Sequence, residues 1–293
     1  MFIATLIAPD GLADASVAAA ADRIAALTGT APARRWIEAG AACDLRFDGD
    51  PAAVRAALEA DAGHDVVVQR EEGRRKRLLV ADMDSTMITI ECIDELADYA
   101  GIKAEIAGVT ERAMRGELDF EAALDARVAL LKGLSADAID RCHAERVRIM
   151  PGAGALVRTM RRHGCRTVLV SGGFTVFADR VAQAIGFDRA IANRLDIAGG
   201  VLGGTVSRPI VDARTKVDTL LAERSAMGLA PDQTLAVGDG ANDIPMIQAA
   251  GLGVAYRAKP KTAAAAHARI ERCDLTALLY AQGYSKAEWA SED

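Results

Sequence analysis

A short apolar run that ends abruptly in two carboxylates constrains this chain more than any other segment. The run at 78–81 (Leu-Leu-Val-Ala) is followed by Asp82-Met83-Asp84-Ser85-Thr86. The run is consistent with a buried parallel strand, and open α/β sheets bind their ligands at the carboxyl ends of such strands. Acids at i and i+2 of a continuing strand share one face and repel each other, and Mg²⁺ would relieve that repulsion. A strand followed by an Asp or Ser-Thr helix cap remains the alternative.

Composition limits the classes of protein to which the chain can belong. It has 293 residues with 51% hydrophobic residues and a net charge of −6, which argues against nucleic acid or an anionic membrane surface as partner. Five cysteines, at positions 43, 92, 142, 165 and 273, show no CxxC spacing. The sequence lacks an apolar run of about 18 residues and a basic leader at its start, so we expect a cytoplasmic protein.

The first 72 residues are expected to form a separate domain of ferredoxin-like βαββαβ order. Its predicted strands and helices span 2–8, 14–28, 34–38, 42–47, 50–61 and 65–70. This order resembles the small-molecule-binding ACT-type domains, which implies a regulatory, dimerising or purely structural role, with a homodimer as one possible outcome. The charged segment 71–77 that follows is expected to be a solvated linker.

The remainder of the chain predicts a doubly wound parallel sheet with a helical insertion. After the strand at 78–81, residues 88–149 are helical in character and form the expected cap. Helices and strands then alternate, which is typical of a Rossmann-like α/β core, with a hairpin around glycines 199, 200, 203 and 204. The predicted core therefore comprises 73–87 and 150–293, and the insertion would cover the carboxyl edge of its sheet as a lid.

Polar groups suited to a phosphate site end two further core strands. One strand ends in Ser171-Gly172-Gly173, where a hydroxyl and glycine N–H groups form an anion cradle, although the segment taken alone favours an ordinary glycine turn with a serine cap. Another ends in the sequence Gly-Asp-Gly-Ala-Asn-Asp at 238–243, which supplies oxygen ligands of the kind that Mg²⁺ prefers. Lys216, which begins a later helix, is either a solvated charge or a fixed ammonium between anions.

The ordered set of DxDST, Ser-Gly, Lys and GDxxND resembles the haloacid dehalogenase-like phosphohydrolases. That resemblance implies that Asp82 attacks phosphorus and forms an aspartyl-phosphate, while Asp84 acts as general acid and then as general base. It further implies that Mg²⁺ is held by the side chains of Asp82 and Asp239 and by the backbone carbonyl of Asp84.

The same resemblance assigns the remaining groups around the phosphate. Ser171, Gly172 and Lys216 would bind the phosphoryl group. Asn242 would join the substrate-binding residues, and Asp243 would support the water shell of the metal. A carboxylate nucleophile splits a slow displacement into two easier steps, and positioning and charge neutralisation supply most of the catalysis.

The insertion resembles that of the phosphoserine phosphatases within the family. The resemblance rests on Glu91, nine residues after Asp82, and on the segment Arg-Val-Ala-Leu-Leu-Lys at 127–132. It implies that Glu91 holds a substrate ammonium and Arg127 a substrate carboxylate, with Met114 and Phe120 lining the pocket. As alternatives, Glu91 could complement a helix dipole, and Arg127 could pair with a carboxylate on its own helix.

The function expected from this resemblance is Mg²⁺-dependent hydrolysis of O-phospho-L-serine to L-serine and phosphate in serine biosynthesis. One alternative is a phosphatase or phosphotransferase for another small metabolite such as phosphohomoserine. A different class, an amino-acid-responsive regulatory protein with a vestigial phosphatase core, is disfavoured by the intact set of acids.

Overall fold

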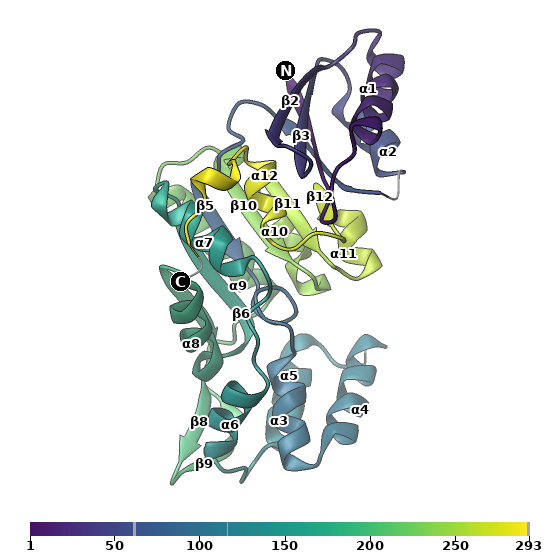
Figure 1. Ribbon diagram of the computed structural model, residues 1–293. Helices are drawn as coiled ribbons and strands as arrows, with labels where there is room; N and C mark the ends of the chain where they lie inside the picture. Colours follow the sequence, from purple (N-terminus) through teal and green to yellow (C-terminus); the bar gives the residue numbers. More distant parts are fainter. Residues whose placement is uncertain (61–62, 116, 292–293) are drawn as a thin grey trace.

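Ten strands form one continuous sheet in the computed structural model, which describes residues 1–60, 63–115 and 117–291 (Figure 1). In sheet order, the strands are β2 (Ala33–Glu38), β3 (Ala42–Phe47), β1 (Phe2–Ile7), β4 (Asp65–Arg70), β12 (Ala268–Ile270), β11 (Leu252–Tyr256), β10 (Thr234–Gly238), β5 (Leu78–Ala81), β6 (Arg166–Phe174) and β7 (Arg189–Asn193). The sheet therefore runs through both the N-terminal unit and the core.

The N-terminal unit has the predicted βαββαβ order. Its strands lie in the order β4-β1-β3-β2, with each adjacent pair antiparallel, as in a ferredoxin-like sheet. Helices α1 (Asp14–Thr28) and α2 (Pro51–Glu59) bury Val17, Ile24, Val54 and Leu58 against one face of the sheet. The structure thus confirms the ferredoxin-like arrangement, whereas the resemblance to ACT-type domains stays a prediction.

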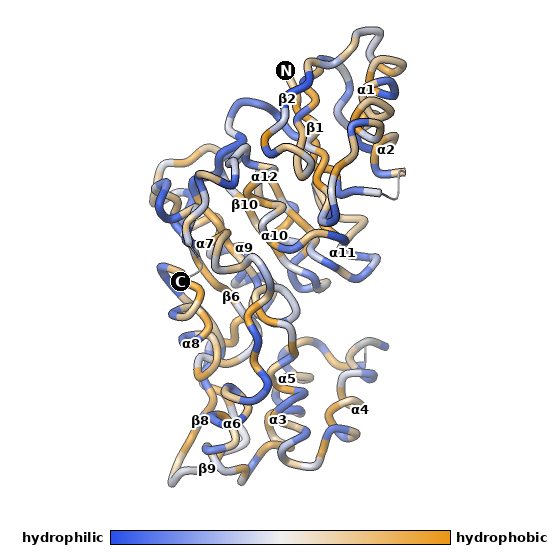
Figure 2. The backbone as a smooth tube through the Cα atoms, in the orientation of Figure 1, coloured by the Kyte–Doolittle hydropathy of each residue, from blue (hydrophilic) through white to orange (hydrophobic). Residues whose placement is uncertain are grey.

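The core is the predicted parallel, doubly wound sheet. Strand β5 lies between β10 and β6, and both pairs are parallel. Because side chains alternate along a strand, Leu78 and Val80 pack on one face of the sheet while Leu79 and Ala81 pack on the other. Both faces are covered, which explains why β5 is continuously apolar. The neighbouring core strands β6 and β10 are likewise largely hydrophobic (Figure 2).

Helices cover the two faces of the core sheet. The face of Leu79 packs against α7 and α8, and the face of Leu78 packs against α9 and α10. These helices are α7 (Ala153–Arg162), α8 (Thr175–Ile185), α9 (Ala213–Ala226) and α10 (Ile244–Ala249), with α11 (Pro260–Ala265) and α12 (Ala277–Ala281) following near the chain end. Within the described residues, no helix combines the length and the apolar character that crossing a membrane requires.

The insertion forms a helical cap beyond the carboxyl edge of the core sheet (Figure 1). Its helices are α3 (Cys92–Ala100), α4 (Lys103–Met114), α5 (Phe120–Leu130) and α6 (Asp137–Glu145). The predicted hairpin, β8 (Leu195–Ala198) and β9 (Val201–Val206), packs against α5 rather than on the core sheet. The backbone N–H of Leu202 donates to Leu134 O, and that of Gly133 donates to Leu202 O. The boundaries at 72, 87 and 149 stay predictions.

The prediction of a solvated linker at 71–77 was wrong for two of its four basic residues. Arg74 and Lys76 are 9% and 5% exposed. The Lys76 ammonium donates to the carbonyl oxygens of Gly73 (2.8 Å) and Asp232 (2.9 Å), and burial lowers its pKa to about 8. One partner lies within the segment, but Asp232 comes from the distant 3-10 helix Pro231–Gln233, so the local charge pattern could not reveal it.

A buried ion pair joins the N-terminal unit to the core. The Arg74 guanidinium donates to both carboxylate oxygens of Asp44, at 2.7 and 3.0 Å, and to the carbonyl oxygen of Ala281 at 3.0 Å. Asp44 is fully buried and also accepts a hydrogen bond from Thr5 at 2.8 Å. Paired charges at this depth are tolerated only when hydrogen bonds satisfy them, and here strand β3, the linker and the C-terminal segment supply those bonds together.

A second buried carboxylate, Asp65 at the start of β4, fixes the same seam. Its oxygens accept backbone N–H groups from residues 271–273 at 2.9–3.3 Å. Nearby, Val66 of β4 pairs with Arg269 of β12. The two units are therefore held by polar contacts on both sides of the strand junction.

We expect Asp44→Asn to lower the free energy of unfolding by about 3 kcal/mol, because it leaves the Arg74 charge buried without its counterion. Urea denaturation measures this change. Arg35→Ala is the matched control, since Arg35 contacts the same carboxylate at 3.2 Å from the exposed side and should cost less than about 1 kcal/mol. Equal effects of the two substitutions would contradict the importance of the buried pair.

Candidate active site

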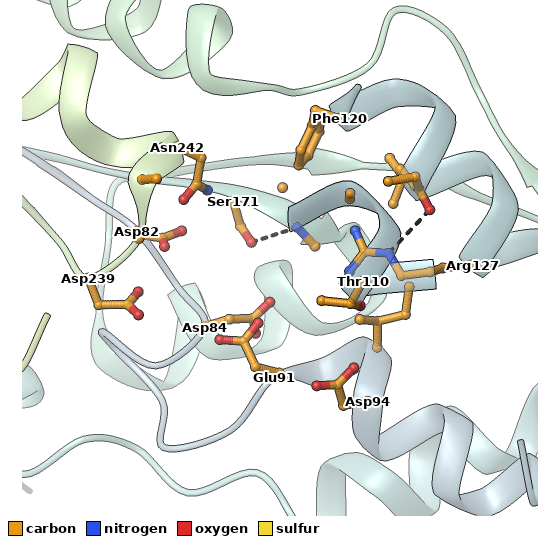
Figure 3. Close-up of a pocket in the computed structure, with 18 of the residues that line it drawn as sticks. Asp82, Asp84, Glu91, Asp94, Thr110, Phe120, Arg127, Ser171, Asp239 and Asn242 are labelled. Atoms are coloured by element: carbon orange, nitrogen blue, oxygen red, sulfur yellow. Dashed lines mark hydrogen bonds between the residues drawn. The ribbon is translucent and has the colours of Figure 1, made fainter. Parts of the chain in front are cut away.

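The carboxyl ends of three core strands meet at one point, as their parallel register requires. Ala81 pairs with Val237 of β10 and with Leu169 of β6. The residues that follow these pairs therefore bring Asp82, Ser171 and Asp239 to one edge of the sheet (Figure 3). The predicted convergence of the DxDST, Ser-Gly and GDxxND segments is present in the structure.

A fully buried lysine bridges two of the acids. The Lys216 ammonium lies 2.6 Å from Asp82 Oδ1 and 2.6 Å from Asp243 Oδ1, and its side chain has no exposed surface. Burial alone lowers the pKa of Lys216, but the two carboxylates outweigh burial and raise it above its ordinary value. Burial and the charge of Asp243 raise the pKa of Asp82 well above its usual range, with Lys216 acting in the opposite direction. The lysine is thus a fixed charge and not a solvated one.

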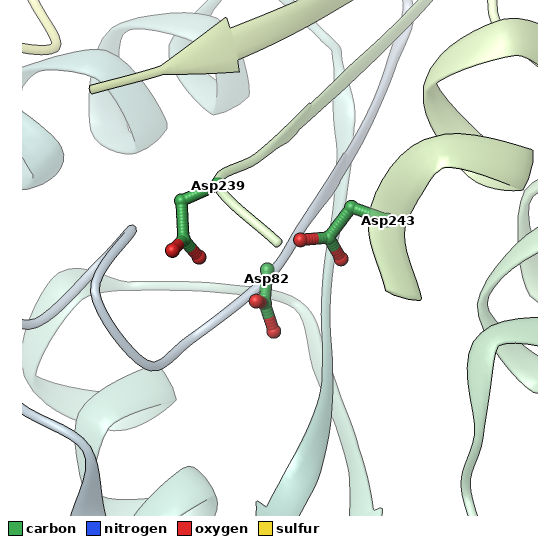
Figure 4. Close-up of side chains that lie close together, drawn as sticks. All are labelled: Asp82, Asp239 and Asp243. Carbon is green, nitrogen blue, oxygen red and sulfur yellow. The ribbon is translucent and has the colours of Figure 1, made fainter. Parts of the chain in front are cut away.

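Three carboxylates form a cluster with the spacing of a cation site. Asp82, Asp239 and Asp243 each place an oxygen within 4.8 Å of the others (Figure 4). Burial, with the charges of Asp243 and Glu91, raises the pKa of Asp239 to about 6. Such mutual repulsion is what a divalent cation with oxygen ligands would relieve.

Asp243 differs from its two neighbours because both of its oxygens already have partners. One binds Lys216, and the other accepts the backbone N–H of Gly240 at 3.0 Å. A Cβ atom at Gly238 would lie 2.4 Å from the Asp243 carboxylate, so only glycine leaves room for it there. This arrangement fits the supporting role predicted for Asp243.

Asp84 faces the opposite side of the same site. Its Oδ1 is buried and has no hydrogen-bond partner among the described residues. Burial, together with the charge of Glu91, raises the pKa of Asp84 to about 7. A carboxyl group with this pKa exists in both protonation states near neutral pH, which suits proton transfer. The neighbouring Cys92 is fully buried.

Ser171, Gly172 and Gly173 lie within β6, which continues to Phe174, and not in a turn after the strand as predicted. The cap closely approaches this segment. The Ser171 hydroxyl accepts the Gly173 N–H at 2.9 Å, and the Asn193 amide donates to the carbonyl oxygen of Gly172 at 2.9 Å. A Cβ atom at Gly172 would lie 3.1 Å from the ring of Phe120. The glycine therefore allows a cap side chain to lie directly over the strand end.

A cavity of about 520 Å³ lies between the core and the cap. Glu91, the N-cap residue of α3, accepts a hydrogen bond from Ser85 at 2.7 Å. Arg127 donates from Nε to the carbonyl oxygen of Ala123, and among the described residues it forms no ion pair. The predicted alternative of a helix-face pair is therefore wrong for Arg127, and its guanidinium can face a ligand.

Most of the predicted site residues line this cavity. Those that do are Asp82, Asp84, Glu91, Phe120, Arg127, Ser171, Gly172, Asp239 and Asn242. Lys216 and Asp243 lie behind the wall, where Lys216 contacts both Asp82 and Asp243. The side chain of Met114 lies outside the described part of the structure, so its pocket role stays a prediction.

The cavity also has lining residues that the sequence analysis did not single out. They include Asp94, Thr110, Asp119 and Lys259. Asp94 and Asp119 stand beside predicted residues, so neighbourhood alone could have suggested them. Lys259 follows β11, whose carboxyl end lies at the same edge as the other three, and this strand-end position is the signal that was missed.

The chain belongs to the haloacid dehalogenase-like hydrolases, because the model of that family matches residues 79–248. Its curated relatives include the phosphoserine phosphatase of Streptomyces coelicolor, which is 45% identical over 247 residues. The match covers 83% of this chain and 60% of that protein. The chain therefore spans less than two thirds of that relative.

Solved structures of similar proteins agree with this placement. An unliganded probable phosphoserine phosphatase from Vibrio cholerae superimposes with a TM-score of 0.77 at 34% identity, covering 98% of this chain and 87% of that one. A phospho-aspartyl intermediate analogue of phosphoserine phosphatase superimposes with a TM-score of 0.65 at 36% identity, covering 70% of this chain and 98% of the other. The first match includes the N-terminal unit.

We expect Lys216→Met to destabilise the metal-free protein by about 3 kcal/mol at pH 8, because it leaves two buried carboxylates without their cation. The substitution raises the pKa of Asp82 further above its unfolded value. Protonation at low pH therefore favours the folded variant, so its deficit relative to the native chain shrinks towards pH 5. Urea denaturation in EDTA at both pH values measures this.

Lys261→Met, which removes an exposed lysine, is the control and should show no such pH-dependent deficit. A Lys216→Met protein whose deficit is the same at pH 5 and pH 8 would contradict the charge argument.

Proposed function

We propose that this protein is a Mg²⁺-dependent phosphomonoesterase that hydrolyses O-phospho-L-serine to L-serine and phosphate. The observation that carries the proposal is one cavity with two different ends. Asp82, Asp84 and Ser171 line the core end, and Glu91 and Arg127 line the cap side (Figure 3). Phosphoserine carries a phosphate, an ammonium and a carboxylate, and this cavity offers a partner for each.

At the phosphate end, Asp82 is the nucleophile. Its carboxylate oxygen attacks phosphorus, the bond between phosphorus and the serine oxygen breaks, and protonated Asp84 supplies the proton that the leaving oxygen takes up. Asp84 then accepts a proton from the water that hydrolyses the aspartyl-phosphate, which regenerates the Asp82 carboxylate. The pKa of about 7 suits Asp84 to both steps.

The residues around Asp82 fit a bound Mg²⁺. The side chains of Asp82 and Asp239 and the backbone carbonyl of Asp84 would hold it, while Asp243 stays engaged by Lys216 and Gly240. The ion would neutralise negative charge on the phosphoryl oxygens. Lys216 contributes a second, permanent charge that orients the Asp82 carboxylate and lowers its repulsion of the incoming phosphate.

At the cap end, the chemistry selects an amino acid. The carboxylate of Glu91 suits a substrate ammonium, and a guanidinium binds a carboxylate through two parallel hydrogen bonds. Burial lowers the pKa of Arg127, and the charges of Asp94 and Glu91 counteract that effect, so the side chain keeps its positive charge. Phe120 closes the cavity over Gly172, next to Ser171 on β6.

The proposal also covers the cellular compartment, the roles of the domains and the oligomeric state. All five cysteines are free and buried, which fits a reducing cytoplasmic compartment. We assign catalysis to residues 73–87 and 150–293 under a cap of 88–149, with residues 1–72 as the surface for a homodimer. Phosphohomoserine, which is one methylene longer, is the principal alternative substrate.

We expect the native chain with Mg²⁺ to release phosphate from phosphoserine faster than from phosphothreonine, phosphohomoserine or sugar phosphates, and EDTA to abolish release.

Asp82→Asn removes the nucleophile and should lower kcat at least about 10³-fold and prevent trapping of an aspartyl-phosphate. Phosphate release and acid-quenched labelling measure these effects. Full activity of Asp82→Asn would exclude the mechanism.

We expect Arg127→Ala to lower kcat/KM for phosphoserine about 100-fold, because it leaves the substrate carboxylate without its partner. Turnover of phosphoethanolamine, which lacks that carboxylate, should change little. Arg112→Ala, which removes an exposed cap arginine paired with Glu117, is the control. If phosphoserine and phosphoethanolamine lose activity equally, Arg127 does not select the amino acid.

A further inference from the structure

The cavity wall is strongly acidic for a site that receives a phosphate. Six carboxylates line it, and among the described lining residues only Arg127 and Lys259 are cationic. The six are Asp82, Asp84, Glu91, Asp94, Asp119 and Asp239. A phosphate dianion that enters this wall is repelled unless a positive charge stands near the phosphate end. Arg127 lies on the cap side, away from Asp239 (Figure 3).

Lys259 stands at the phosphate end. It lies between β11 and α11 as the N-cap residue of α11, and its backbone N–H donates to the carbonyl oxygen of Asp239 at 3.2 Å. It lines the cavity together with Asp239, Gly240 and Asn242. This backbone hydrogen bond therefore fixes Lys259 next to the GDxxND segment, which carries Asp239.

Within the described chain, the Lys259 ammonium forms no ion pair, although its charge counteracts the effect of burial on the pKa of Asp239. No carboxylate lies within ion-pair distance of it, and the residue is exposed. Lys216, by contrast, is fully buried and bound to two aspartates. The nearby Arg257 is directed elsewhere, since its guanidinium lies over the Tyr256 ring and donates to the carbonyl oxygen of Cys273. Lys259 is thus the cation at this end that a ligand can engage.

We propose that Lys259 is a substrate-binding residue that engages the phosphate group of the incoming substrate and lowers its repulsion by the acidic wall. This inference rests on the proposed phosphomonoesterase function. Lysine suits the role because its compact ammonium on a flexible stem can follow a phosphate without a fixed bidentate geometry. The residue contributes to phosphate affinity, whereas Lys216 orients the nucleophile.

The test compares Lys259→Gln, Lys259→Arg and Lys261→Gln in the full chain with Mg²⁺. Lys261 lies two residues further along, on α11, is exposed, and does not appear among the lining residues. We expect Lys259→Gln to raise KM for phosphoserine about tenfold, to raise the inhibition constant of inorganic phosphate equally, and to leave that of L-serine unchanged. Lys259→Arg should recover most of the affinity, and Lys261→Gln should match the native protein.

Ionic strength supplies a readout that a merely structural role would not change. The kcat/KM of the native protein should fall more steeply with added salt than that of Lys259→Gln, because the screened charge is absent from the variant. The inference is overturned if Lys259→Gln behaves like Lys261→Gln, or if serine and phosphate inhibition weaken equally. Failure of the native chain to hydrolyse phosphoserine would instead reject the proposed function.

Discussion

The contact of one buried ammonium with two buried carboxylates is the constraint on which the active-site edge depends. Lys216 lies 2.6 Å from both Asp82 and Asp243, and these residues come from α9, from the end of β5 and from the loop after β10. Three segments distant in sequence must therefore be correctly placed before the ammonium can contact both carboxylates. Removal of the Lys216 charge leaves the two carboxylates uncompensated in a buried region.

The N-terminal unit follows the same logic at a second location. Arg74 and Asp44 balance each other in the interior, and the carbonyl oxygen of Ala281 completes the arrangement. Charge balance thus joins the beginning, the linker and the end of the chain. A unit attached in this way shares its stability with the core instead of moving as an independent module.

The sequence predicted the architecture well where a pattern is local. Apolar runs that end in acids located β5 and β10, and the βαββαβ order of the first 70 residues follows from alternating periodicities. The strands β7 and β12 were missed because they lie at the edges of the parallel core, where β7 is only partly buried and β12 has three residues. The buried Arg74 and the cavity position of Lys259 were missed for a different reason. Each depends on partners that only the fold brings near, so a charged residue in a loop gives no local sign of its role.

The continuous sheet has a consequence for experiments on shortened chains. Strand β12 is the outer strand of the parallel core, and β4 lies beside it. Removal of the first 72 residues would expose this edge, and an unprotected strand edge promotes association between chains. Loss of activity in such a truncation would therefore report aggregation as readily as the loss of a regulatory signal. Point substitutions at the seam separate these two causes, because they leave the edge covered.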